Sequence, residues 1–308
     1  MILPMFKSLI RRKLTTYLQE VLTPAVASAT ATRVSYDFRR ERLSEAAACS
    51  EVQGTRPMVD AETPIIVSLT THGTRLYEVH LAIESIMQGT VKPHHIVLWL
   101  DDDDPRPLPV ALQRQMQRGL TVRHTRPMRS YAKLVPSLSA FPEAHIVTID
   151  DDIFYPADFL ERLLETHAVY PSAVIANVIM TMARDDEGIP QGILDWPYIP
   201  TTVHSEACRD LFFEGFGGVF YPAGSMPPET QDETLFKRLC PTADDVWFNA
   251  MTRLAGTATH VCLRSAYDFI AAVNQACQDN ALNLTNNSEN RNDRQIRAVW
   301  QHFHLQHQ

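Results

Sequence analysis

The sequence lacks several features that would place it in a specialised class of protein. Its 308 residues include only five cysteines, an odd number, and no CxxC pair. A disulfide framework and a zinc knuckle are therefore not expected, and a reducing cytoplasm is the simpler context. No run of 18 or more apolar residues is present, so we expect no transmembrane helix. A GxGxxG loop after the first strand is also missing, which argues against a dinucleotide-binding Rossmann domain.

An excess of positive charge is missing as well. The formal net charge is −8, whereas a nucleic-acid-binding protein would usually be basic, so nucleic acid is not an expected partner. Apolar residues make up 45% and charged residues 21% of the chain, which is ordinary for a globular protein. The acidic residues gather in short clusters, a pattern that favours metal-binding clefts over a general acidic surface.

The first 22 residues do not form a secretory signal, because the apolar run before Lys7 is too short and the charges follow it. Their pattern predicts a basic amphipathic helix, which either contacts an anionic membrane surface peripherally or packs on its own domain. Residues 24–62 have no sustained period and are interpreted as a linker with one short helix. The expected division is an N-terminal helix and linker over 1–62, a single domain over 63–300 and a C-terminal tail over 301–308.

From Pro64 onward, predicted strands and helices alternate four times within about 100 residues. The expected strands are 65–69, 95–100, 120–123 and 145–149, and the expected helices are 76–88, 110–118 and 130–141. This alternation predicts an α/β fold, a Rossmann-like sandwich with a central, mostly parallel sheet and crossover helices. Later in the chain we expect helices at 157–168 and 244–255 and strands at 173–178 and 260–263.

Three consecutive carboxylates, Asp150, Asp151 and Asp152, follow directly after a short apolar strand. The carboxyl end of a strand is where open α/β sheets bind ligands. If the segment stays extended, Asp150 and Asp152 point to one side and Asp151 to the other. Asp150 and Asp152 would then share one Mn²⁺ or Mg²⁺, with a diphosphate filling the remaining oxygen positions. The alternative is a solvated acidic turn that caps the next helix.

A second acidic pair, Asp244 and Asp245, begins an amphipathic helix. Thr242 or Asp244 is a suitable N-cap, and capping alone would explain one of the two carboxylates. The functional alternative is a general base, since a positioned and partly desolvated carboxylate can accept the proton of a sugar hydroxyl.

Four further features have both a functional and a structural interpretation. Lys133 would contact phosphate or lie in a solvated basic turn. Gly217 and Gly218 would let a ligand approach the backbone or form a plain bulge. The Asp101–Asp104 run would contact a ribose or base or form a solvated loop, and His260 would ligate a metal or serve a structural role.

The order of the motifs resembles a known family. The segments that carry the resemblance are Ser68-Leu-Thr-Thr71, Ser85-Ile86, Val91-Lys-Pro93, Ser130-Tyr-Ala-Lys-Leu134, Thr148-Ile-Asp-Asp-Asp152, Gly217-Gly-Val-Phe-Tyr-Pro222 and Cys240-Pro-Thr-Ala-Asp-Asp-Val-Trp247. Together they look like a bacterial glycosyltransferase of the GT-A type, similar to the inverting family 2 and the surface-polysaccharide glycosyltransferases. The resemblance covers about residues 64–300.

The resemblance implies a role for each matching residue. Asp150 and Asp152 fall on the DxD motif, which holds the metal and, with Asp151, the donor diphosphate. The other implied donor contacts are Thr70, Arg75, Lys133, Gly217 and Gly218. Asp244 and Asp245 fall on an acidic pair that includes the base; Asp-Asp replaces the commoner Glu-Asp, which leaves the choice open, and we favour Asp245.

The expected function is metal-dependent transfer of a sugar from a nucleotide-diphosphate donor to a hydroxyl of a glycan or lipid-linked glycan. The expected setting is bacterial surface polysaccharide or lipopolysaccharide synthesis, in the cytoplasm or at the inner face of the membrane. One alternative is a sugar-nucleotide nucleotidyltransferase, although Thr70–Arg75 is a poor version of its Gly-rich, basic loop. The other is a glycan-binding or scaffold protein with a degenerate site.

Overall fold

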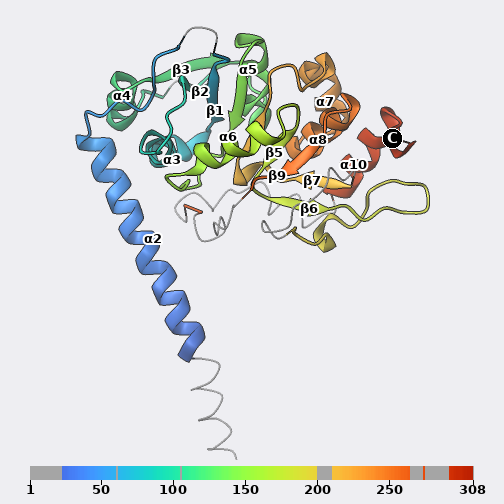
Figure 1. Ribbon diagram of the computed structural model, residues 1–308, viewed down its shortest axis with the longest axis horizontal. Coiled ribbons are helices and arrows are strands. Elements are labelled where there is room, and N and C mark those ends of the chain that lie inside the picture. The colour runs from blue at the N-terminus through green and yellow to red at the C-terminus, as the bar shows by residue number, and fades with distance from the viewer. Residues whose placement is uncertain are drawn as a thin grey trace, which may run out of the picture. The chain divides into compact units, whose positions relative to one another are not determined.

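The computed structural model describes residues 23–59, 62–104, 106–199, 210–263, 273–274 and 291–307 (Figure 1). The expected amphipathic helix over residues 1–22 lies outside these ranges. The chain divides into two compact units, Met1–Glu45 and Ala46–Gln308. In the described ranges, no helix has both the length and the apolar character to cross a membrane.

Helix α2 runs over Thr23–Cys49, a span of 27 residues, and it corrects the expectation of a linker with one short helix. The segment has no interior glycine and is rich in Ala and Arg, which have high helix propensity. Pro24 falls in the first turn, where its missing N–H costs nothing. Hydrophobic periodicity does not reveal such a helix, because the helix propensity of its residues supports it rather than a single apolar face.

The main sheet has seven strands in the order β3-β2-β1-β4-β8-β5-β9. The strands are β1 Ile65–Thr70, β2 His95–Asp101, β3 Leu120–Thr125, β4 His145–Thr148, β5 Val174–Ala176, β8 Val219–Tyr221 and β9 Thr259–Val261. Strands β1 to β4 are mutually parallel, and β9 is parallel to β5. Only β8 runs antiparallel to its neighbours β4 and β5 in this sheet. The predicted α/β fold with a central, mostly parallel sheet is confirmed.

Helices cover both faces of the sheet, so the fold has three layers (Figure 1). One face packs against α3 Val79–Met87, α4 Val110–Gln117 and α6 Phe159–Val169. The other packs against α5 Val135–Ala140, α7 Glu233–Leu239, α8 Asp244–Leu254 and α10 Arg291–His302. In β1 the side chains alternate between the two cores, with Ile66 in one and Ile65 and Val67 in the other, as a strand buried on both faces requires.

Two predicted helices are each interrupted. The 76–88 helix consists of a short 3₁₀ segment, η2 Gly73–Tyr77, followed by α3, and the 130–141 helix consists of η3 Arg129–Lys133 followed by α5. Pro136 lies in the first turn of α5, where a proline fits. The other short elements are η4 Ile193–Asp195, η5 Gly215–Gly217, η6 Pro228–Gln231 and η8 Leu305–His307.

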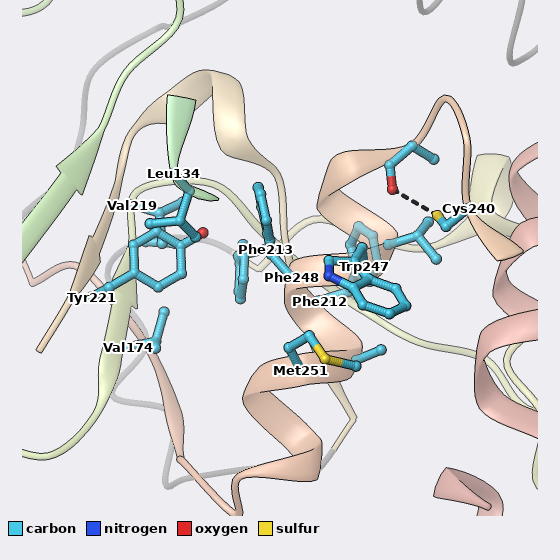
Figure 2. Packing of buried hydrophobic residues seen from close by; sticks show 14 of the residues in the cluster. Leu134, Val174, Phe212, Phe213, Val219, Tyr221, Cys240, Trp247, Phe248 and Met251 are labelled. Atoms are coloured by element: carbon cyan, nitrogen blue, oxygen red, sulfur yellow. Dashed lines mark hydrogen bonds between the residues drawn. The ribbon is translucent and has the colours of Figure 1, made fainter. Parts of the chain in front are cut away.

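A core of aromatic side chains fixes α8 against the sheet. Figure 2 shows Phe248 of α8 between Tyr221 and Trp247, and all three side chains are buried. Phe213 belongs to β7 Leu211–Phe213, which pairs with β6 Ile179–Thr181 in a second, two-stranded sheet. The thiol of Cys240 donates to the Ala243 carbonyl at 3.0 Å, just before α8 begins. The amino end of α8 is therefore held from several directions.

The chain reverses its direction of travel across the sheet at β1. Strands β2 and β3 follow on one side of β1, whereas β4 lies on its other side. Because the four strands are parallel, their carboxyl ends meet at one edge, and the crevice at such a switch point is the usual ligand site of open α/β sheets.

Candidate functional site

A cleft of about 830 Å³ lies at this switch point. Loops after β1, β2 and β4 form part of its wall, and the amino end of α8 and the segment after β7 form another part. Its lining includes Thr70, Thr71, His72, Arg75, Asp101, Arg129, Ser130, Lys133, Asp150, Asp151, Asp152, Tyr198, Phe212, Glu214, Phe216, Asp244, Asp245 and Asn292. The two acidic motifs, separated by about 90 residues in the sequence, therefore face the same space.

The three consecutive aspartates do not alternate as an extended segment would. Strand β4 ends at Thr148, and Asp151 and Asp152 lie in a turn. Arg75 donates to Asp151 at 2.6 Å and to Asp152 at 2.9 Å, so these two carboxylates share one cation. The expectation that Asp151 points away from Asp152 is therefore wrong, because the turn ends the twofold alternation.

Asp151 is the most deeply buried of the three, at 5% exposure. Its carboxylate also accepts a hydrogen bond of 2.6 Å from the Thr71 hydroxyl. Burial raises the pKa of Asp151, against the opposing effects of Arg75 and Thr71. Asp151 therefore anchors the turn to the loop after β1 and orients the neighbouring aspartates.

Lys133 connects the two acidic motifs. Its Nζ lies 2.9 Å from Asp150 Oδ1, 3.0 Å from Asp244 Oδ2 and 3.9 Å from Asp245 Oδ1. Burial lowers the pKa of Lys133, but the charges of these carboxylates outweigh it and raise the pKa well above the usual value. Lys133 is only 4% exposed, so the solvated-turn interpretation is wrong, and its ammonium joins the aspartates together.

Asp245 has the properties of a general base. One oxygen, Oδ2, accepts a 3.0 Å hydrogen bond from the Gly215 N–H, and its side chain keeps 31% exposure. Burial raises the pKa of Asp245 to about 8, with Lys133 opposing the shift and Asp244 adding to it. A carboxylate with a raised pKa near neutrality is suited to taking a proton.

Neither acidic residue of this pair is the N-cap of α8. The N-cap is Ala243, without a side-chain capping bond, and both aspartates fall in the first turn. The Ser130 hydroxyl donates to Asp244 Oδ1 at 2.7 Å, and Lys133 contacts the other oxygen. Asp244 is thus held in place from η3, and the helix N-terminus favours the negative charge of both residues.

The glycines near this site differ in their surroundings, and the sequence alone does not show which of them lies at the site. A Cβ on Gly215 would lie 2.5 Å from Asp245 Oδ1 and 2.6 Å from Lys133 Nζ, so the backbone passes directly beside the acidic cluster. Gly217 and Gly218 are not among the residues that line the cleft. A Cβ on Gly217 would meet Val178, and one on Gly218 would meet Phe159. The structure therefore brings Gly217 and Gly218 against the protein interior rather than to the cleft surface.

Of the Asp101–Asp104 run, Asp101 alone lines the cleft in the described part of the chain, beside His72. Burial raises the pKa of Asp101. Asp104 instead pairs with Arg106. His260 is buried in β9 and stacks on Tyr170 with ring centroids 3.8 Å apart, which supports its structural interpretation.

Arg129, Glu214 and Tyr198 are among the cleft residues that were not proposed as site residues from the sequence. Arg129 has a φ of 54°, a left-handed conformation that a non-glycine residue rarely adopts outside functional segments. Glu214 and Tyr198 lie on the wall near β7. Glu214 directly precedes the glycine-rich segment, so the glycines could have drawn attention to it in the sequence. Tyr198 lies in an irregular stretch and gave none.

The cleft contains five aspartates of the two motifs, and two basic side chains, Arg75 and Lys133, contact them. Carboxylate oxygens are the ligands that Mg²⁺ and Mn²⁺ prefer, so the chemistry of Asp150 and Asp152 fits the expected ion. Within the described ranges, no three His, Cys, Asp or Glu side chains are grouped as a complete metal site. A bound ion would therefore need ligands from its substrate as well.

Comparisons with known proteins give little further guidance. No family model matches the chain, and no curated protein matches it. A solved structure with similarity to the chain is CMP:2-keto-3-deoxy-manno-octonic acid synthetase complexed with CTP. The identity is 13%, the match covers 74% of this chain and 100% of the synthetase chain, and the TM-score is 0.40. A likeness at this level supports no argument about activity.

Proposed function

We propose that the protein is a metal-dependent glycosyltransferase of the GT-A type, which moves a sugar from a nucleotide-diphosphate donor to a hydroxyl of a glycan acceptor. The observation that supports this most is the placement of Asp245. It is a carboxylate with a raised pKa, and it faces the same cleft as the aspartates that follow β4. A base and a diphosphate site side by side are what sugar transfer to a hydroxyl requires.

The donor would bind over the carboxyl ends of β1, β2 and β4. Thr70 and Arg75 lie where the nucleotide would pass, and Asp101 and His72 flank that end of the cleft. Asp150 and Asp152 would hold a divalent cation. When bound, such an ion offsets the charge that builds on the leaving diphosphate.

Asp245 would take the proton of the acceptor hydroxyl as that oxygen attacks the anomeric carbon. The Gly215 N–H fixes one carboxylate oxygen, which leaves the other to point toward the acceptor and Lys133. Lys133 would act by orienting the aspartates of both motifs and not by touching the diphosphate. Arg129 is the basic side chain that we assign to the donor phosphates instead, since it is exposed on the cleft wall.

A glycan or lipid-linked glycan as acceptor, a role in surface polysaccharide synthesis and a place at the inner membrane face remain parts of this proposal. The nucleotidyltransferase alternative has one resemblance in its favour, the synthetase named above, and that likeness is too weak to argue from. The loop after β1 has a single glycine, Gly73, where such enzymes carry a glycine-rich loop.

The experiment is incubation of the full chain with a panel of nucleotide sugars and glycan acceptors and, separately, with nucleoside triphosphates and sugar acids, with products read by mass spectrometry. We expect release of a nucleoside diphosphate from one donor, loss of that release with EDTA, and loss in the Asp150→Ala/Asp152→Ala double variant. Release of pyrophosphate from a nucleoside triphosphate and a sugar acid would overturn the proposal in favour of a nucleotidyltransferase. Full activity of the double variant would end the metal-site assignment.

A further inference from the structure

Glu214 directly precedes Gly215, the residue whose N–H holds the proposed base Asp245, and it has no role in the chemistry proposed above. Strand β7 ends at Phe213, directly before Glu214. The Glu214 N–H donates to the Val178 carbonyl at 3.0 Å, which fixes its backbone. The side chain lines the cleft and is half-buried. A group bound to Glu214 would therefore share the cleft with the hydroxyl that Asp245 activates.

Tyr198 completes this part of the wall. Its hydroxyl donates to Glu214 Oε2 at 3.0 Å, and its backbone forms a bridge to Met180 of β6. The Tyr198 side chain is 58% exposed although the residue lines the cleft, so its ring offers an open apolar face. An aromatic face beside a fixed carboxylate is a surface that suits a sugar ring, whose C–H groups meet the aromatic face while its hydroxyls meet the carboxylate.

The charge at this wall favours a ligand that donates hydrogen bonds. Among the described residues Glu214 has no ion pair, and its one side-chain hydrogen bond comes from a neutral hydroxyl. Burial raises the pKa of Glu214, with the Tyr198 hydrogen bond opposing the shift. Two basic side chains of the cleft, Lys133 and Arg75, are already bound to aspartates, and Arg129 is the one assigned to the donor phosphates. An acidic group bound beside Glu214 would be repelled by its carboxylate, which no described basic side chain neutralises.

We propose that Glu214 and Tyr198 form an acceptor subsite that selects a sugar unit carrying ammonium or hydroxyl donors and rejects an acidic sugar unit. This inference rests on the proposed function, because it takes the neighbouring Asp245 as the base. Glu214 is then a specificity-determining residue: one of its oxygens is fixed by Tyr198, and the other accepts from the acceptor sugar.

Three methyl glycosides that share the same sugar ring and differ in charge provide the test. They are methyl glucosaminide, which is cationic, methyl glucoside, which is neutral, and methyl glucuronide, which is anionic. Their binding to the full chain is measured by ligand-observed NMR near neutral pH. We expect the glucosaminide to bind most tightly, the glucoside next and the glucuronide least, with about a tenfold span, because hydrogen bonds to charged groups are worth more than neutral ones. The isosteric Glu214→Gln variant should lose most of this span, and Tyr198→Phe should weaken all three.

The control is Glu143→Gln, an exposed carboxylate between α5 and β4 that should leave the order unchanged. Circular dichroism of each variant shows that the fold persists. Binding of the glucuronide as tightly as the glucoside, no binding of any of the three, or an unchanged span in Glu214→Gln would overturn the proposal. Failure of the proposed function would be seen separately, as an absence of nucleotide-sugar turnover in the wild-type chain.

Discussion

The chemistry proposed for this cleft depends on how one carboxylate is held. Asp245 combines a hydrogen bond from the Gly215 N–H, a lysine at 3.9 Å and a side chain that still reaches the cleft. Its neighbour Asp244 is less exposed and is bound by both Ser130 and Lys133. The two residues therefore differ in role although they are chemically identical: Asp244 positions Lys133, and Asp245 is available to a substrate.

Replacement of Asp245 by Asn tests this division. The amide keeps the shape and cannot accept a proton, so we expect turnover to fall by about 10²–10⁴-fold while nucleotide binding persists. In the wild-type chain the rate should rise as the pH increases toward and through about 8, because Asp245 must lose its proton to act as a base. Initial rates from pH 6 to pH 9 check both statements. An unchanged rate in Asp245→Asn would remove this residue from the mechanism, and Glu143→Gln is the matched control.

At the scale of an element, the segment after β7 is built to pass close to α8. A Cβ on Gly215 would stand within 2.6 Å of both the Asp245 carboxylate and the Lys133 ammonium. The ammonium is held by Asp150 and Asp244, and the carboxylate is bound to the Gly215 N–H itself, so an added Cβ would disturb both groups. The glycine is therefore required by the approach of two chain segments at the base.

Gly215→Ala should accordingly displace the base. We expect at least a tenfold fall in turnover and a loss of about 1–3 kcal/mol in the free energy of unfolding, as in other overpacked sites. Gly224→Ala is the matched control, since Gly224 has a φ of +73° and nothing within 4 Å of the added Cβ. It should cost about 1–2 kcal/mol of backbone strain and leave turnover intact. Equal turnover in both variants would refute the packing argument.

On the sheet face opposite to α8, a buried ion pair joins α3 to the end of α4. Glu84 of α3 is fully buried and receives hydrogen bonds of 2.9 Å from both Arg118 nitrogens and from Gln115 of α4. Arg118 also donates to the Val52 carbonyl. This bond connects the first residues of the unit Ala46–Gln308 to helices α3 and α4.

Glu84→Gln should lower the free energy of unfolding by about 3–5 kcal/mol, because it leaves the Arg118 charge buried without its counterion. The partly exposed pair of Asp158 and Arg162 is the comparison, and Asp158→Asn should cost less than about 1 kcal/mol. Urea denaturation of the three proteins measures the difference. If Glu84→Gln lowers the free energy of unfolding by less than about 1 kcal/mol, the charge of the buried pair contributes little to stability.

For the molecule as a whole, the sequence predicts the sheet well and the site in part. Buried parallel strands such as β1 and β2 are continuous apolar runs, so their positions and the α/β class follow from local pattern. The contact of Lys133 with Asp150 and Asp244 joins positions far apart in the chain, and only the folded topology brings them together. The turn at Asp151 and the role of Glu214 depend in the same way on neighbours from other elements.

The central claim is that the aspartates after β4 hold a divalent cation that in turn binds a nucleoside diphosphate. Calorimetric titration of the wild-type chain with UDP, GDP and CMP, with and without Mn²⁺, tests it directly, with Asp150→Ala/Asp152→Ala as the paired variant. We predict that one of the diphosphates binds in the presence of Mn²⁺ and that both removal of the ion and the double substitution weaken this binding at least tenfold. Binding that is equally tight without Mn²⁺ and in the double variant would contradict the claim.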